Sequence, residues 1–230
     1  MKVLKTTFIG VVGIFLFSAC NNHNNNNPTD NFDVNEEVLT KAIDLGLPSG
    51  TLWADRNIGA MYPEDYGDYF SWGETEPKES YNWQTYKFSK GSKSSLTKYN
   101  TNSSFGAVDN KTSLEEADDV AKIRLGDSWQ MPTEDDFEEL RSKCTWIWTT
   151  QNGVKGYKVA GTNGNSIFLP TTGYCILLNQ MNAGHDGHYW SSTLSDEEPY
   201  YAKQLSFDII GNNLFVSNRE YGITVRAVKL

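Results

Sequence analysis

Two short apolar runs, separated by a turn, begin the part of the chain that has a globular composition. The runs cover residues 42–47 and 51–54, and Pro48-Ser49-Gly50 lies between them. Proline and glycine between apolar runs are typical of a turn that joins strands, so this pattern predicts strand, turn, strand. Aromatic residues and glycine keep alternating over 57–60 and 65–74, which indicates further short β segments.

The spacing of apolar residues changes to a helical period in two places. Leu114, Ala117, Val120, Ala121 and Leu125 form the first stripe. This stripe predicts a helix capped by Thr112 or Ser113 and ended by Gly126.

The second stripe places Phe137, Leu140, Arg141 and Cys144 on one helix face. Thr133 is its predicted N-cap. The acidic residues at 134–136 complement the helix dipole in the first turn.

In the rest of the chain, apolar and polar residues either alternate with the period of two that is typical of strands or show no period. Asn163-Gly164 between 156–160 and 166–169 predicts a hairpin, and Trp146 and Trp148 should share a core-facing side. Further strands are expected at 188–193, 201–208, 214–217 and 223–228. The polar stretch 77–111 predicts a long surface excursion without a core of its own. The pattern as a whole predicts an α+β domain.

The first forty residues differ in composition from the rest. Lys2 and Lys5 precede an apolar run over 6–17, and small residues stand before Cys20. This pattern predicts a signal peptide over 1–19 that is too short to span a membrane as a helix. Its end is similar to the lipobox of bacterial lipoproteins, which implies cleavage before Cys20 and acylation of that residue; the alternative is conventional cleavage and secretion. Asparagine-rich residues 20–40 predict a disordered tether, and Asn21 after Cys20 implies, by the same resemblance, the outer membrane.

The charge composition excludes some classes of binding partner. Removing Lys2 and Lys5 leaves 18 basic residues against 29 acidic ones. Such a surface repels nucleic acid and anionic membrane surfaces, so neither is expected as a partner beyond the lipid anchor. With Cys20 lipidated, Cys144 and Cys175 either pair as a disulfide or remain two buried thiols.

Four segments carry a resemblance to a known family. They read Asp44-Leu45-Gly46-Leu47-Pro48-Ser49-Gly50-Thr51, Trp129-Gln130-Met131-Pro132-Thr133-Glu134, Tyr189-Trp190-Ser191-Ser192 and Gly222-Ile223-Thr224-Val225-Arg226. With these segments the chain resembles the Fibrobacter succinogenes major paralogous domain. That family is similar to formylglycine-generating enzymes and to the variable proteins of diversity-generating retroelements. The resemblance implies a C-type-lectin-like domain over 41–230, with two helices packed on twisted antiparallel sheets.

Catalysis is not expected. The enzymes of this group use a cysteine pair late in the chain, and no cysteine follows Cys175. Ser191 and Ser192 with His188 and Asp186 include the residue types of a catalytic triad, but no nucleophile elbow surrounds the serines. His185, Asp186 and His188 are the one clustered set of metal-ligand types; we interpret them as a polar loop, and expect neither a metal nor another cofactor.

The resemblance to retroelement variable proteins places ligand contacts between residues 184 and 222. The amphipathic and adaptable side chains of this segment are those found in good binding surfaces. They are His185, Asp186, His188, Tyr189, Tyr200, Tyr201, Asn218, Arg219 and Tyr221. The alternative is a structural β domain whose exposed tyrosines bind no ligand. Arg226 is expected to be structural, paired with a carboxylate such as Glu138.

These observations predict an outer-membrane-anchored lipoprotein. Its domain would bind an extracellular or periplasmic ligand, a protein or a glycan, without catalysis. The alternative is a structural or accessory subunit of a surface assembly, and an enzyme of the formylglycine-generating type is the less favoured third hypothesis.

Overall fold

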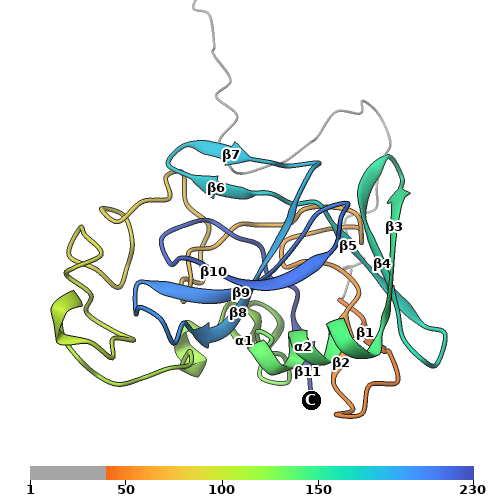
Figure 1. Ribbon diagram of the computed structural model, residues 1–230, viewed down its shortest axis with the longest axis horizontal. Coiled ribbons are helices and arrows are strands. Elements are labelled where there is room, and N and C mark those ends of the chain that lie inside the picture. Colours follow the sequence, from red (N-terminus) through yellow and green to blue (C-terminus); the bar gives the residue numbers. More distant parts are fainter. Residues whose placement is uncertain (1–39) are drawn as a thin grey trace, which may run out of the picture.

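The structure is a computed structural model that describes residues 40–230. The predicted signal peptide, Cys20 and all but the last residue of the predicted tether lie outside the described residues. Within 40–230 the chain forms antiparallel sheets and two α-helices, so the predicted α+β class is confirmed (Figure 1). In this part of the chain no helix is long and apolar enough to cross a membrane.

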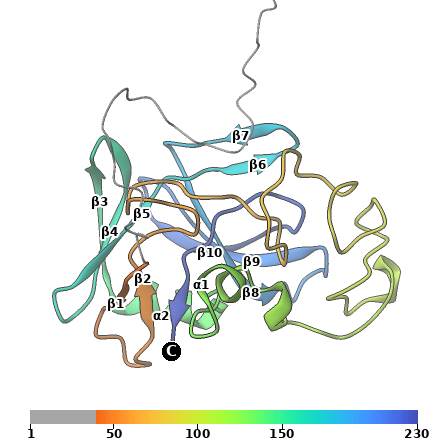
Figure 2. The same ribbon diagram turned by 180° about the vertical axis from the view of Figure 1, so that it is seen from behind.

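The first and last strands of the described chain lie in one small sheet. Strands β1 (Ala42–Asp44), β2 (Leu52–Ala54) and β11 (Val228–Lys229) pair in the order β1-β2-β11, which places the C-terminus beside residues 42–54 (Figure 2). The predicted turn between β1 and β2 is present, with Gly50 N–H donating to Leu47 C=O over 3.0 Å. The predicted strand over 223–228 is shorter than expected, because Ile223 and Thr224 make only isolated bridges to Phe70 and Tyr189.

The first helix begins later than predicted. Residues 116–118 form a single 3-10 turn, and α1 (Val120–Leu125) is capped by Asp119, whose carboxylate accepts from the N–H groups of Ala121 and Lys122. Thr112 and Leu114 are not available to a helix, because their backbones pair with β8 (Gly187–Leu194). Gly126 ends the helix as predicted.

The second helix, α2 (Glu134–Lys143), confirms the predicted cap. Thr133 Oγ1 accepts from Asp136 N–H over 3.1 Å, and Asp136 Oδ2 accepts from Thr133 N–H over 2.8 Å. This reciprocal capping box satisfies two backbone donors at the helix start. Phe137 and Leu140 on its inner face are buried.

Loss of this cap gives a small, local prediction. Thr133→Ala should lower the free energy of unfolding by about 1 kcal/mol, because one N-terminal N–H loses its acceptor. Urea unfolding measures the change, with Ser142→Ala on the exposed face of the same helix as the control. A loss no larger than that of the control would contradict the role given to the capping box.

Strands β3 (Thr145–Gln151), β4 (Val154–Ala160) and β5 (Ser166–Pro170) form a second sheet in that order. The predicted Asn163-Gly164 turn joins β4 to β5, and Gly164 adopts the left-handed φ of 88° that such a turn needs. Trp146 and Trp148 both face Tyr157, at ring-centroid distances of 5.3 and 5.1 Å. They pack half-buried against the core, as predicted.

A third sheet contains β8, β9 (Tyr201–Phe207) and β10 (Asn212–Asn218) in the order β10-β9-β8. The short hairpin of β6 (Tyr174–Ile176) and β7 (Asn179–Met181) lies above this sheet and α2 lies below it (Figure 1). The sheet therefore has one face toward α2 and one face toward the β6–β7 hairpin.

The prediction that 77–111 is a surface excursion without a core of its own is wrong. The segment buries Tyr81, Leu96 and three aromatic side chains of the main core, Tyr86, Phe88 and Tyr99. Edge-to-face contacts link these rings, with Tyr86 5.8 Å from Phe88 and Phe88 5.4 Å from Tyr99. Aromatic side chains widely spaced in a polar sequence bury enough area to order the segment without helix or strand periodicity.

The structure answers the open question of a Cys144–Cys175 disulfide, and it shows that the predicted carboxylate partner of Arg226 is wrong. Cys144 is a free, half-buried thiol, so it does not form the disulfide with Cys175; burial raises its pKa to about 11. Glu138 pairs with Arg141 over 2.6 Å on the surface of α2, whereas Arg226 is fully buried elsewhere. The Arg226 guanidinium donates to the Asn57 side chain and to backbone carbonyls, so neutral acceptors replace the expected carboxylate.

Candidate ligand-binding face

Alternation along the strands sorts the β8–β9–β10 sheet into two faces. Residues opposite each other in the register share a face. Leu205 pairs with Tyr189 and Leu214, and these three pack with α2. The opposite face, which we call the hairpin face, carries the partly or fully accessible residues His188, Ser206, Asn213, Phe215 and Ser217 and the buried Gln204.

A row of polar side chains crosses the three strands on the hairpin face. His188 Nδ1 lies 3.1 Å from Gln204 Oε1, and Gln204 Nε2 donates to Ser217 Oγ over 2.7 Å. Burial lowers the pKa of His188, so the ring is neutral near pH 7. With Nδ1 donating to Gln204, Nε2 is left as an acceptor, and it has no hydrogen-bond partner among residues 40–230.

Aromatic rings border this row at one end. Tyr174 of β6 lies edge-on to His188 at 4.9 Å and stacks on Tyr221 at 5.8 Å. Tyr221 N–H donates to Asn218 C=O over 3.1 Å, and burial raises the pKa of the Tyr221 hydroxyl. Both tyrosines are half-exposed, so they present an aromatic and a polar edge together.

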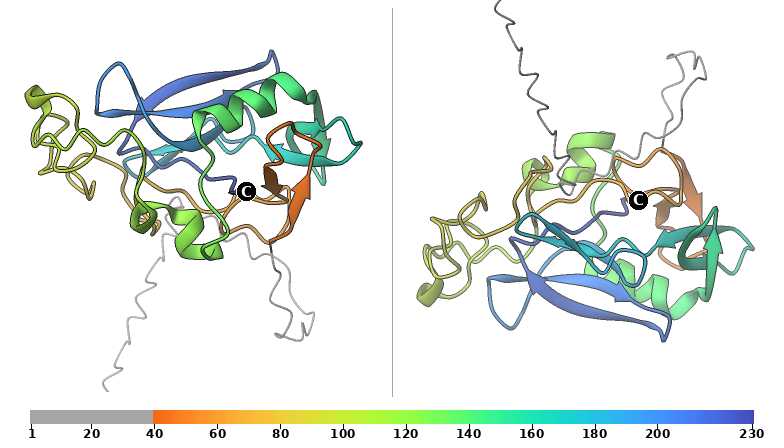
Figure 3. Two further views of the ribbon diagram at one scale, coloured as in Figure 1. Left: turned by 90° about the horizontal axis from the view of Figure 1, so that it is seen from below. Right: turned by 90° about the horizontal axis from the view of Figure 1, so that it is seen from above.

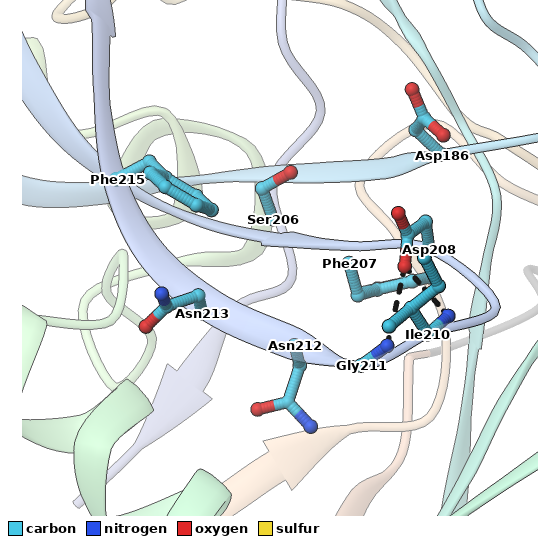
Figure 4. A pocket seen from close by; sticks show the side chains of 9 residues that line it. All are labelled: Asp186, Ser206, Phe207, Asp208, Ile210, Gly211, Asn212, Asn213 and Phe215. Atoms are coloured by element: carbon cyan, nitrogen blue, oxygen red, sulfur yellow. Dashed lines mark hydrogen bonds between the residues drawn. The ribbon is translucent and has the colours of Figure 1, made fainter.

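A shallow pocket of about 310 Å³ lies around the β9–β10 turn (Figure 4). Asp208 Oδ1 fixes the turn by accepting from Ile210 N–H at 2.7 Å and Gly211 N–H at 3.2 Å. Ile210 is 90% exposed and Phe215 is 53% exposed. The other lining residues are Asp186, Ser206, Phe207, Asn212 and Asn213. Large apolar and small polar groups thus meet in one accessible hollow.

Most of the sequence-predicted residues lie near this face. His185 is exposed in the loop before β8, Asp186 lines the pocket, and His188 belongs to the polar row. Tyr221 and Asn218 lie at the aromatic end.

Tyr200 and Tyr201 form a separate group. Their ring centroids are 4.3 Å apart, and the ring of Tyr200 also contacts Phe105 at 5.1 Å. Both tyrosines are half-exposed.

Two predicted contact residues are wrong, because both are fully buried. Tyr189 points toward α2, stacks on Phe207 at 5.7 Å and donates its hydroxyl to Pro170 C=O over 2.7 Å. The Arg219 guanidinium lies over the Trp72 ring at 4.9 Å and donates to the Tyr86 hydroxyl over 2.8 Å. Neither side chain can reach a ligand; both hold the frame together.

The sequence did not predict six residues of the face and its border: Tyr174, Gln204, Ser206, Asn213, Phe215 and Ser217. The sequence did contain one signal, because side chains two residues apart in a strand lie on the same face of the sheet. Gln204 and Ser206 have this spacing in one strand, and Phe215 and Ser217 have it in the next. That signal assigns positions to a face only once the register of the strands is known. Tyr174 comes from a different hairpin, which no local pattern connects to the sheet.

Glu220 is the unusual acid beside this face. It is buried, its Oε2 has no hydrogen-bond partner within the described chain, and burial raises its pKa to about 7. Lys78 and Lys93 oppose that shift without cancelling it. The carboxyl is therefore partly protonated near neutral pH.

Glu220→Gln should stabilise the protein at pH 8 and leave it unchanged at pH 4. Below the usual pKa of 4.5 the carboxyl is neutral in both the folded and the unfolded chain. Between 4.5 and about 7 only the unfolded chain ionises, so stability is lost as the pH rises. At roughly 1.4 kcal/mol per pKa unit, the gain at pH 8 is on the order of 2–3 kcal/mol. Urea unfolding of both proteins at pH 4 and pH 8 measures this gain. Equal stabilities of the two proteins at pH 8 would refute the claim that burial raises the pKa of Glu220.

The side chains considered for a catalytic triad and for a metal site are not arranged for either role in the described chain. Ser191 Oγ donates to Lys203 C=O and Ser192 Oγ to Pro132 C=O, so neither hydroxyl is bonded to His188. Within residues 40–230, no group of three or more His, Cys, Asp or Glu side chains is arranged to hold a metal ion.

Comparison of the chain with protein-family models, with curated proteins and with solved structures finds no match.

Proposed function

We propose that this protein is a non-catalytic recognition module, with a C-type-lectin-like domain anchored to the outer membrane through Cys20. Its ligand is an extracellular or periplasmic protein or glycan, bound at the hairpin face. One observation carries the proposal: the accessible pocket at the β9–β10 turn, where Ile210 and Phe215 lie beside Asp186 and Ser206.

The chemistry of the face favours a ligand that is both polar and apolar. Apolar and aromatic surfaces give contact area at low entropic cost, and the nearby amides and hydroxyls give directional hydrogen bonds. Asp186 and the acidic surface favour a neutral or basic ligand over an anionic one. Sugar rings and protein side chains of mixed character both meet these conditions.

The frame beneath the face suits a fixed binding surface. Tyr189 and Arg219 tie the sheet to β5 and to the 77–111 segment through buried hydrogen bonds. Side chains held on strands keep their positions better than side chains on loops. The order of two helices followed by strands also agrees with what the family resemblance implies for the fold.

A structural or accessory subunit of a surface assembly is the second candidate. The tip of the β6–β7 hairpin favours it, because Leu177 and Leu178 are 52% and 60% exposed and Met181 is 40% exposed. Adjacent exposed apolar side chains of this size often mark a protein contact.

The ligand can be sought with the full chain, in detergent, on glycan and surface-protein arrays. We expect a reproducible hit that Ile210→Ala weakens and Ile209→Ala does not. The two isoleucines share one exposed turn, but only Ile210 lines the pocket. Equal binding by both variants would contradict the assigned pocket, and no hit on either array would favour the assembly subunit.

The anchor has its own test. Cys20→Ala should release the protein from the membrane fraction, because the acceptor of the lipid is lost. Fractionation and immunoblotting measure the distribution. Membrane retention of the variant would refute the lipobox interpretation, without bearing on the binding face.

A further inference from the structure

The two edges of the β8–β9–β10 sheet differ. The outer edge of β8 is covered: Trp190 N–H donates to Thr224 C=O, Ser192 N–H to Pro132 C=O and Leu194 N–H to Thr112 C=O, over 2.7–3.0 Å. Strand β10 pairs with β9 on one side and, among residues 40–230, with no strand on the other. Figure 3 shows this sheet along one side of the molecule.

The register identifies which backbone groups of β10 are open. Asp208 N–H donates to Gly211 C=O over 3.0 Å, which sets the phase of the β9–β10 ladder. Bonded pairs alternate along an antiparallel ladder, so Phe215 bonds to β9, while Leu214 and Val216 direct their N–H and C=O groups outward. Leu214 N–H meets only the side-chain oxygen of its neighbour Asn213, at 3.1 Å.

At the start of β10 the Asn212 carbonyl accepts from Arg141 of α2 over 3.3 Å, whereas from Leu214 onward no residue of the strand prevents pairing with another strand. Strand β10 reads Asn212-Asn213-Leu214-Phe215-Val216-Ser217-Asn218, with no charged residue and no proline. Natural proteins usually protect an open edge with lysine, proline or a bulge. Instead, the centre of β10 is apolar, and Phe215 is 53% exposed.

We propose that β10 pairs antiparallel with β10 of a second copy of this chain, about a two-fold axis at Phe215. In this register Leu214 of each copy lies opposite Val216 of the other, so the outward N–H and C=O groups of both residues are paired. The two Phe215 rings meet at the axis as a non-hydrogen-bonded pair, the closer kind of cross-strand pair. Around them Asn213 lies opposite Ser217, and the ladder ends at Asn212, whose carbonyl already accepts from Arg141 over 3.3 Å.

The strand itself favours a second copy as the occupant. Its composition is symmetric about Phe215, with an aliphatic residue on each side and small polar residues beyond, so one copy complements another. The chain is acidic overall, with a formal net charge of −9, but no charge lies on this strand. The same patch is used by both copies, and the covered β8 edge prevents further addition, so assembly closes at a dimer.

Such a dimer has a consequence for ligand binding, although it does not depend on the proposed function. The two-fold axis is perpendicular to the joined sheet, so both hairpin faces lie on the same side. Two pockets would then be presented together, and a ligand with repeated features would gain avidity without any new contact.

Strand β3 is another edge strand that can serve for comparison. It ends the β3-β4-β5 sheet, and Ile147 at its centre is 49% exposed. Its two neighbours, Trp146 and Trp148, pack against Tyr157. Unlike β10, it has no further apolar side chains at its turn, where Gln151 is bonded to Glu64 over 2.9 Å.

Sedimentation velocity of the full chain in detergent, over a range of concentrations, tests the proposal. We expect a reversible dimer with an affinity in the roughly micromolar to millimolar range of interfaces below standard size. Phe215→Lys should weaken it by at least roughly tenfold, since two like charges would lie directly opposite each other. Ile147→Lys, an equally exposed position on the other edge, should leave the dimer unchanged.

Hydrogen exchange gives a second test that needs no variant. On raising the concentration, exchange of the Leu214 and Val216 amides should slow, whereas that of Phe215, already bonded to β9, should not change. A protein that stays monomeric, a dimer that Ile147→Lys dissolves, or protection that spares Leu214 and Val216 would each overturn the proposal. Loss of array binding with the dimer intact would count against the pocket and not against this pairing.

Discussion

Replacing Arg219 with methionine should lower the free energy of unfolding by about 4 kcal/mol, at about 1 kcal/mol for each hydrogen bond lost. The guanidinium is fully buried and donates to the Tyr86 hydroxyl and to the carbonyls of Lys98, Tyr99 and Pro199. It thereby joins the end of β10 to the 77–111 segment. Ligand affinity of the folded variant should not change, because Arg219 does not reach the surface.

Urea unfolding of Arg219→Met measures the stability, and the arrays measure the binding. Arg124→Met is the matched control, since the surface ion pair of Arg124 with Glu76 should contribute less than about 1 kcal/mol. A variant as stable as that control, with its binding lost, would restore Arg219 as a contact residue and contradict the face described above.

Arg226→Met should cost about 3 kcal/mol, again at about 1 kcal/mol per lost hydrogen bond. Its guanidinium donates to Asn57 Oδ1 at 2.8 Å, Ala54 C=O at 3.1 Å and Phe168 C=O at 2.9 Å. These acceptors lie in or near β2 and in β5, so one side chain joins the terminal sheet to the second sheet. Burial lowers its pKa to about 10, which leaves it charged at neutral pH.

Arg226→Lys separates geometry from charge. An ammonium group keeps the charge but cannot present the planar fork that reaches three separate acceptors, so we expect it to be destabilised as well. Denaturant unfolding of both variants decides the matter. Full stability of Arg226→Lys would show that charge, and not the guanidinium geometry, is what this site needs.

Local signals predicted the elements whose causes are local. The Thr133 cap, the Asn163-Gly164 turn and the apolar stripe of α2 each depend on neighbouring residues, and each is present. The start of α1 was wrong because Thr112 and Leu114 pair with β8, about eighty residues away in the sequence. The backbone groups of Thr112 and Leu114 that would have begun the helix are hydrogen-bonded to β8 instead.

The candidate site depended on information that the sequence does not contain locally. The segment at 218–221 has the polar composition of an exposed turn, yet Arg219 and Glu220 are buried beneath the 77–111 segment. Strand β8 buries both Tyr189 and Trp190, one on each face, so alternation could not say which would be accessible. Phe215 becomes visible as a site residue only once the register of β9 and β10 is known.

The most direct test of the recognition face is to map the ligand found on the arrays by its effect on backbone amide chemical shifts of the full chain. We expect the shifts to cluster at Asp186, Ser206 and Ile210, with smaller changes at His188 and Tyr221. Shifts confined to the β6–β7 tip at 177–181, or to the buried surroundings of Tyr189 and Arg219, would contradict the proposed face.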